Sequence, residues 1–146
     1  MAAPTISDLP WLGILLALVW NFFLGFTWYA SFTPTGRIWM KANNVDPKAK
    51  PAPGEMVKGL LLMIVGAILT MSVLAYLLVS MQQVYGSSLD WMSGVWAGGF
   101  VWLGFFLPVQ LGGLAWEKKT VALTAVNAGY HLVSLVVGGI ILATMA

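Results

Sequence analysis

The amino-acid sequence predicts an all-α protein whose four helices cross a membrane as a bundle. Two observations predict this class. Hydrophobic residues make up 60% of the 146 residues and charged residues only 8%, with a mean hydropathy of +0.87, whereas a soluble globular domain carries roughly 25% charged residues. Four segments are also long and apolar enough to cross a hydrocarbon core of about 30 Å, which takes about 20 residues. A chain of this composition cannot cover itself with polar surface, so we expect it in a bilayer.

The four spans are predicted to form one domain over residues 1–146. They occupy about residues 10–31, 57–82, 91–116 and 120–144, with a loop at 32–56. The first span follows the stretch MAAPTISDLP, which has no Lys or Arg and so lacks the charged start of a cleaved signal peptide. Only Glu117, Lys118 and Lys119 lie between the last two spans, so we expect these spans to form a tight antiparallel pair.

The basic residues gather in two loops and predict the orientation of the chain. Lys and Arg collect at the cytoplasmic ends of membrane spans. The first loop and its edges hold Arg37, Lys41, Lys48, Lys50 and Lys58, and the third loop holds Lys118 and Lys119. The chain ends and the second loop hold none. We therefore expect loop 32–56 in the cytoplasm and both termini on the non-cytoplasmic side.

The first loop begins with a segment that favours a short helix on the membrane surface. In GRIWMKAN, Trp39 and its apolar neighbours would lie at the acyl boundary, while Arg37 and Lys41 would lie among anionic headgroups. The following VDPKAKPAPGE has three prolines in a short polar run, which predicts an extended linker. The alternative is a basic loop that only sets the topology.

The last span carries polar or small residues at regular spacing. Steps of four and three residues connect Thr120, Thr124, Asn127, His131, Ser134 and Gly138. A helix has 3.6 residues per turn, so this spacing places them in one stripe along the helix. Unpaired polar groups in hydrocarbon cost several kcal/mol. We therefore expect the stripe to face protein.

Two further spans carry polar groups near the level of this stripe. Asn21 lies near the middle of the first span, at the depth of His131, and is a candidate partner for His131 or Asn127. Gln110 follows Pro108 on the third span, about level with Thr124. A cavity between the first and fourth spans with His131 at its floor is one consistent interpretation. The candidate pocket or interhelical residues are Asn21, Trp28, Tyr29, Gln110, Thr124, Asn127, Tyr130, His131 and Ser134.

His131, the only histidine in the chain, has two interpretations. It could be a titratable group in a relay, gate or binding pocket, or a neutral imidazole whose interhelical hydrogen bond contributes roughly 0.6–2 kcal/mol. No Asp or Glu lies inside a span, which argues against proton-coupled transport. We predict no metal site and no cofactor, although a haem or pigment held by one imidazole stays an alternative.

Small and aromatic residues in the spans predict close helix packing. Gly94 and Gly98 form a G-xxx-G pair in the third span, and Gly66 with Thr70 forms a similar pair in the second. Such pairs let helix backbones approach one another within a bundle or an oligomer. Deep in their spans lie Trp20, Trp96 and Trp102, where an indole N–H needs a partner or a packed protein neighbour.

Two stretches resemble a known protein family. NFFLGFTWYASFTPTGRIWM, residues 21–40, and VNAGYHLVSLVVGGIIL, residues 126–142, carry Trp-Tyr and Asn-x-x-Tyr-His segments. They are similar to an uncharacterised family of small bacterial four-span membrane proteins, a domain of unknown function. The resemblance implies a four-span fold and a location in the bacterial inner membrane. It implies no catalytic or binding residues.

We expect a protein that is not an enzyme, because the sequence has no Ser/His/Asp arrangement, HExxH motif, paired carboxylates or phosphate-binding loop. The leading hypothesis is a membrane protein that binds or passes a small solute or lipid through a polar pocket between the first and fourth spans. The alternative is a structural or accessory subunit of a larger membrane complex. The expected partners are the lipid bilayer, a second copy or a larger membrane complex, and a small solute, and the small net charge of +2 does not indicate nucleic acid.

Overall fold

A computed structural model describes residues 3–49, 52–86 and 88–146. Lys50, from the predicted basic loop, lies outside the described residues. Four helices are long and apolar enough to cross a membrane, which confirms the predicted fold class. They are α1 (Trp11–Trp28), α3 (Pro53–Tyr85), a continuous helix of α4 (Trp91–Val101), η2 (Trp102–Phe106) and α5 (Leu107–Trp116), and α6 (Val121–Met145). A short η1 (Ile6–Asp8) precedes α1, and a fifth, shorter helix, α2 (Pro34–Ala42), follows it.

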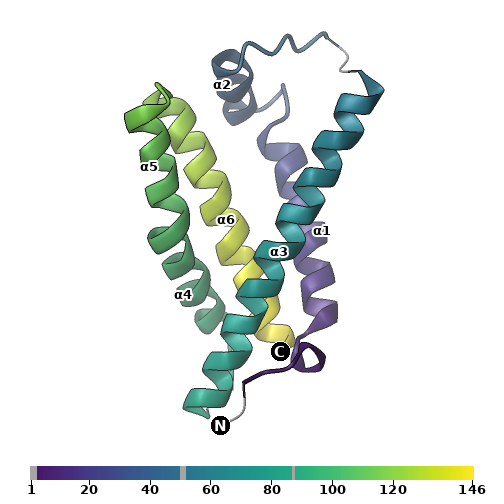
Figure 1. Ribbon diagram of the computed structural model, residues 1–146, viewed down its shortest axis with the longest axis vertical. Coiled ribbons are helices and arrows are strands. Elements are labelled where there is room, and N and C mark those ends of the chain that lie inside the picture. Colours follow the sequence, from purple (N-terminus) through teal and green to yellow (C-terminus); the bar gives the residue numbers. More distant parts are fainter. Residues whose placement is uncertain (1–2, 50–51, 87) are drawn as a thin grey trace.

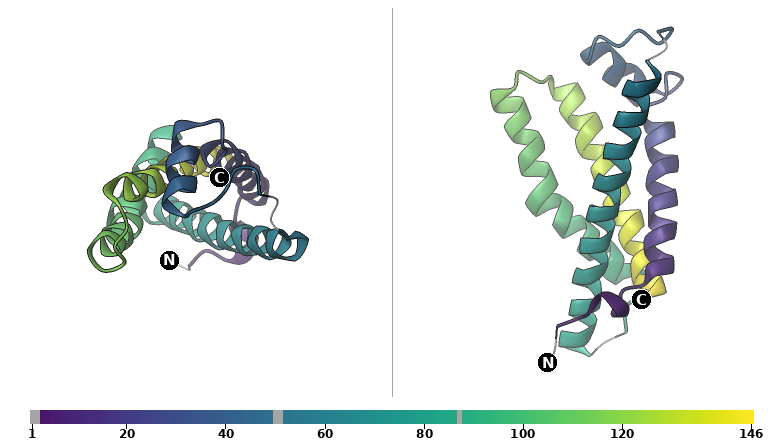
Figure 2. Two further views of the ribbon diagram at one scale, coloured as in Figure 1. Left: turned by 90° about the horizontal axis from the view of Figure 1, so that it is seen from above. Right: turned by 45° about the vertical axis from the view of Figure 1, so that its right-hand side comes forward.

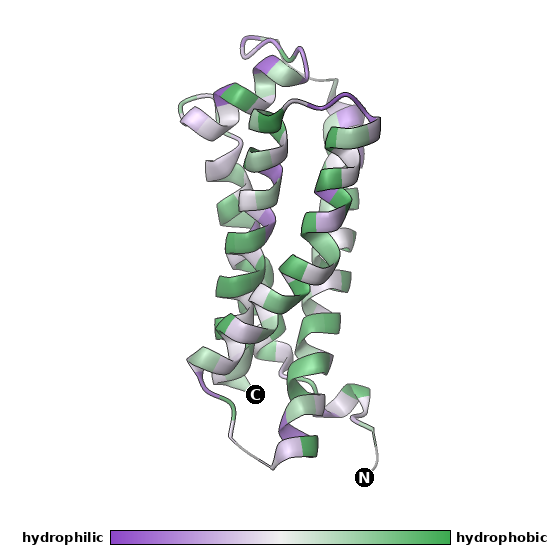
Figure 3. Ribbon diagram, turned by 90° about the vertical axis from the view of Figure 1, so that its left-hand side faces the viewer, coloured by the Kyte–Doolittle hydropathy of each residue, from purple (hydrophilic) through white to green (hydrophobic). Residues whose placement is uncertain are grey.

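The last helix, α6, lies at the centre of the bundle, with α1 and α4 packed along it and α3 crossing in front (Figure 1). Helix α2 and the α5–α6 turn lie at one end, and the two ends of the chain lie at the other (Figure 1). Hydropathy follows the same division, since apolar residues cover the lengths of the helices and hydrophilic residues gather in the loops (Figure 3). All described Lys and Arg residues belong to segments at the α2 end, whereas Asp8 and Asp90 belong to segments at the opposite end.

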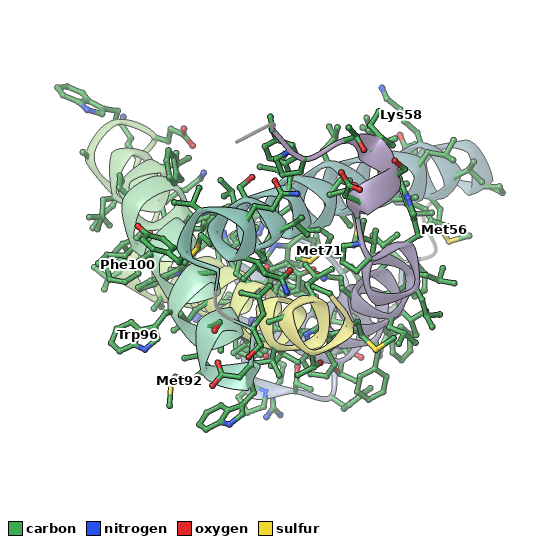
Figure 4. The ribbon with its side chains drawn as sticks, turned by 90° about the horizontal axis from the view of Figure 1, so that it is seen from below. Met56, Lys58, Met71, Met92, Trp96 and Phe100 are labelled. Atoms are coloured by element: carbon green, nitrogen blue, oxygen red, sulfur yellow. The ribbon has the colours of Figure 1, made fainter. Side chains whose placement is uncertain are left out.

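Helices α4 and α6 are in backbone contact through glycines. A Cβ atom added to Gly98 would lie 2.6 Å from the carbonyl carbon of Leu135, and one added to Gly94 would overlap the backbone of Gly139. The predicted G-xxx-G pair therefore packs α4 against α6 inside the bundle. Next to this contact, Met71 of α3 lies at the centre of the bundle, whereas Trp96 and its labelled neighbours on α4 point outward (Figure 4).

Helix α3 is packed at one end only. Its second half contributes the buried side chains Met71, Leu74 and Leu78, while residues 53–66 are exposed. The helix begins at Pro53, earlier than the predicted start of the span at about 57. The prediction of an extended linker was therefore wrong for its last residues, 53–55, which are helical. Proline fits the first position of a helix because its missing N–H would have no partner there. The exposed half of α3 leaves space between itself and its neighbours.

A tight turn fixes α2 against the end of α1. Thr33 caps α2 by accepting a hydrogen bond from the amide of Gly36 at 3.1 Å, and the Thr35 hydroxyl donates to the carbonyl of Trp28 at 2.5 Å. Gly36 lies so close to Ala30 that a Cβ atom would overlap the Ala30 carbonyl. The predicted short helix after the first span is thus present, and it lies across the end of the bundle (Figure 2, left).

The third span contains a π-helical turn, η2, just before Pro108. Proline has no N–H to continue the α-helical pattern, and π-turns inside helices often occur at functional sites. At the start of the span, Asp90 caps α4 by accepting hydrogen bonds from the amide and hydroxyl of Ser93. These bonds hold the pKa of the Asp90 carboxyl below its usual range.

Candidate functional site

A groove of about 850 Å³ lies between α1, α3 and α6. It extends to η2 at Phe106 and to α2 at Trp39. Most of its lining is apolar, and none of its lining residues is Asp, Glu, Lys or Arg. Volumes of about 300–1,000 Å³ with mainly apolar walls and a few polar groups are typical of small-molecule sites. The groove therefore has the size and composition of a site for an apolar or amphipathic molecule.

The groove opens sideways between α1 and α3. A smaller space of about 230 Å³ between these helices shares five lining residues with the groove: Asn21, Phe22, Met63, Ala67 and Tyr130. Phe22 is 53% exposed and Met63 is 53% exposed, although both line the groove. Side chains that line a groove and also face outward mark its opening. The groove is thus accessible from the apolar flank of the bundle.

At its floor, two polar side chains are paired. The Ser134 hydroxyl donates a short hydrogen bond to Asn21 Oδ1, and Asn21 Nδ2 donates to the carbonyl of Ala17 at 2.8 Å. Both residues are buried. Asn21 therefore bonds to the predicted stripe on α6, but through Ser134 rather than through His131 or Asn127, because Ser134 lies one helical turn further along the same face.

Asn127 has its own partner from the end of α1. The Tyr29 hydroxyl donates to Asn127 Oδ1 at 3.3 Å. The Tyr29 ring also lies edge-on to Trp39, with ring centres 5.6 Å apart, and its centre is 5.3 Å from that of Tyr130. Tyr29 thereby connects α1, α2 and α6 around the mouth of the groove.

Two tryptophans fix the segment of α6 that carries Tyr130 and His131. Trp28 Nε1 donates to the carbonyl of Val126 at 3.1 Å, and Trp102 Nε1 donates to the carbonyl of Ala128 at 2.8 Å. The first indole comes from α1 and the second from η2, so α6 is held from two neighbouring elements. The Trp102 indole thus has the partner that its depth predicted, a backbone carbonyl. Trp20 Nε1 is instead buried without a partner in the described chain, and Trp96 is exposed on the outer face of α4.

His131 lines the groove between two aromatic rings. The centre of its imidazole is 4.8 Å from that of Phe106 and 5.2 Å from that of Tyr130. It makes no hydrogen bond to any residue that the structure describes. The Tyr130 hydroxyl, which lies beside Gly25, also has no partner within the described chain. Two adjacent residues therefore offer unused hydrogen-bonding groups to the groove.

The structure places the other predicted residues outside the groove. Trp28 and Asn127 support its wall, Gln110 is half-buried on α5, and Thr124 is buried with its hydroxyl unpaired. Of the predicted surface residues, Trp39 lines the groove, while Arg37 and Lys41 are exposed. The groove residues outside the predicted set include Met63, Ala67 and Thr70 of α3 and Phe106. The small-residue pair Gly66 and Thr70 was the only sequence signal for the α3 wall, and Phe106 had only the nearby Pro108.

No three His, Cys, Asp or Glu side chains among the described residues are grouped as metal ligands would be. The groove side chains without a hydrogen-bond partner among the described residues are hydroxyls, an indole and an imidazole, which suit hydrogen bonding to a ligand: Ser31, Trp39, Thr70, Tyr130 and His131.

A family model described as "Protein of unknown function (DUF1761)" matches residues 12–143. No curated protein and no solved structure matches the chain.

Proposed function

The chain belongs to the DUF1761 family, and we propose that it is a non-enzymatic integral membrane protein that binds an amphipathic, membrane-soluble molecule in the groove between α1, α3 and α6. The observation that supports this proposal most directly is the groove itself, with His131 on its wall and without a hydrogen-bond partner among the described residues. A structural role for His131 predicts an imidazole bonded to a neighbouring helix. An imidazole that faces an open apolar space instead supports a role in binding.

The groove also favours the binding hypothesis over that of an accessory subunit. An accessory subunit needs no opening between the first and fourth spans, and close packing there would strengthen it. Helix α3, the second span, forms a wall of the groove that the sequence did not predict. Its exposed half leans away from α6 (Figure 1), which leaves the space of the groove between the two helices. The sideways opening suits a ligand that enters from the bilayer.

Filling the groove should remove the bound molecule without unfolding the protein. Gly66 lines the groove, and a Cβ atom there would meet no atom within 4 Å. We expect Gly66→Phe to lower the amount of lipid-soluble molecule that copurifies with the protein at least tenfold, because the ring occupies the binding space. Native mass spectrometry of the protein extracted in mild detergent measures the bound species.

Gly59→Phe is the matched control for this experiment. Gly59 lies seven residues earlier on α3, has equally open surroundings and does not line the groove, so it should retain the ligand. Equal occupancy in both variants would contradict the proposal. Protein that carries no lipid-soluble molecule but copurifies with other chains would favour the accessory-subunit hypothesis.

We also propose that both termini lie on the non-cytoplasmic side of a bacterial inner membrane. The concentration of Lys and Arg at the α2 end supports this orientation, and the resemblance to small bacterial membrane proteins supports the location. In intact cells, a cysteine added after Ala146 should react with a membrane-impermeant maleimide, and Lys41→Cys should react only after lysis. The reverse pattern would overturn the orientation.

A further inference from the structure

We propose that the groove ligand is an uncharged planar ring that carries carbonyl oxygens and one apolar tail, which is the chemistry of an isoprenoid quinone. This inference rests on the proposed function and specifies its ligand class. Three features of the groove lead to it: its lack of charge, its unused hydrogen-bond donors and the aromatic rings around them.

The absence of charge determines which part of a lipid can occupy the groove. None of its lining residues is Asp, Glu, Lys or Arg. A phosphate or carboxylate moved into such a space would lose its hydration without gaining an opposite charge, which is unfavourable. None of the described basic residues lines it: Arg37, Lys41, Lys48, Lys58 and Lys118 are exposed, and Lys119 is half-buried. The polar part of the ligand is therefore neutral.

Two adjacent polar groups without a partner in the described chain can donate to a groove ligand. The Tyr130 hydroxyl carries one O–H, and the neutral His131 imidazole carries one N–H. Neither has a partner within the described chain, whereas Asn21, Ser134 and Tyr29 are already paired. Two neighbouring donors without acceptors fit a ligand whose polar atoms are carbonyl oxygens.

Aromatic rings surround these donors. Four aromatic residues line the groove, from α2, η2, α6 and the residue after α1: Trp39, Phe106, Tyr130 and Tyr29. Such rings favour stacked or edge-on contact with another planar ring. A ring between them would have its tail directed along the opening between α1 and α3, where Phe22 and Met63 are both half exposed. The tail would then lie among lipid chains.

The test measures binding of 2-decyl-1,4-benzoquinone to the protein in phosphatidylcholine nanodiscs, by equilibrium dialysis against empty nanodiscs. Decylbenzene has a planar six-membered ring and the same tail but no carbonyl oxygen. We expect the quinone to bind at least tenfold more tightly than decylbenzene. Tyr130→Phe and His131→Phe should each weaken quinone binding about tenfold, since each removes one hydrogen bond, and leave decylbenzene binding unchanged.

The outcomes separate this inference from the function on which it rests. If decylbenzene binds as tightly as the quinone and Gly66→Phe blocks the binding of both, the groove binds apolar molecules in general and the quinone assignment is wrong. If Tyr130→Phe and His131→Phe both bind quinone like the wild type, the assignment is also wrong. If no probe binds above empty nanodiscs, the proposed function fails as well.

Discussion

The Gly98→Ala substitution is expected to separate α4 from α6 and to lower the stability of the protein by more than about 3 kcal/mol. Overpacking a well-packed interior with one group commonly costs about 1–3 kcal/mol. At Gly98 the added methyl group meets the backbone of Leu135 rather than a side chain that could rotate away. The helices must therefore move apart, and the Trp102 hydrogen bond to Ala128 is lost with their contact.

Thermal unfolding in detergent micelles, followed by circular dichroism, measures this effect. Gly99→Ala is the matched control, because Gly99 is the next residue on α4 and its added Cβ atom meets nothing within 4 Å. It should unfold at the wild-type temperature or slightly above, since alanine favours a helix over glycine by about 0.5–1 kcal/mol. Equal unfolding temperatures for the two variants would show that α4 and α6 do not approach as closely as described.

The four spans could be predicted from the sequence because length and hydropathy alone determine which segments cross a bilayer. The α6 stripe could also be predicted, since a 3.6-residue period puts Asn127, His131 and Ser134 on one face. Residue spacing along one helix does not determine the register between two helices. This is why Ser134, rather than His131, is the partner of Asn21.

The groove was predictable only in part. The polar residues of α1 and α6 indicated a site, but the α3 wall depends on the tilt of that helix, which follows from contacts at its far end. Met71, Leu74 and Leu78 hold the second half of α3 in the bundle, while residues 53–66 are left exposed. Hydropathy does not distinguish these halves, since both are apolar. The π-turn that brings Phe106 to His131 likewise has only Pro108 as its sequence signal.

The Gly36→Ala substitution should displace α2 from the mouth of the groove and weaken ligand binding at least tenfold. Gly36 lies in the first turn of α2, where a Cβ atom would overlap the carbonyl of Ala30. Relief of this overlap moves α2 and, with it, Trp39, whose ring packs on Tyr29. The four spans keep their own contacts, so the unfolding temperature should fall less than in Gly98→Ala.

Gly54→Ala is the control for this last variant, because Gly54 belongs to the same end of the molecule and has nothing within 4 Å of its added Cβ atom. Native mass spectrometry gives the bound fraction, and trypsin cleavage after Arg37 and Lys41 reports release of α2. Rapid cleavage with loss of ligand in Gly36→Ala alone would mean that α2 closes the groove. Rapid cleavage with full ligand retention would instead mean that α1, α3 and α6 hold the ligand without it, which would confine the site to the part of the groove around Tyr130 and His131.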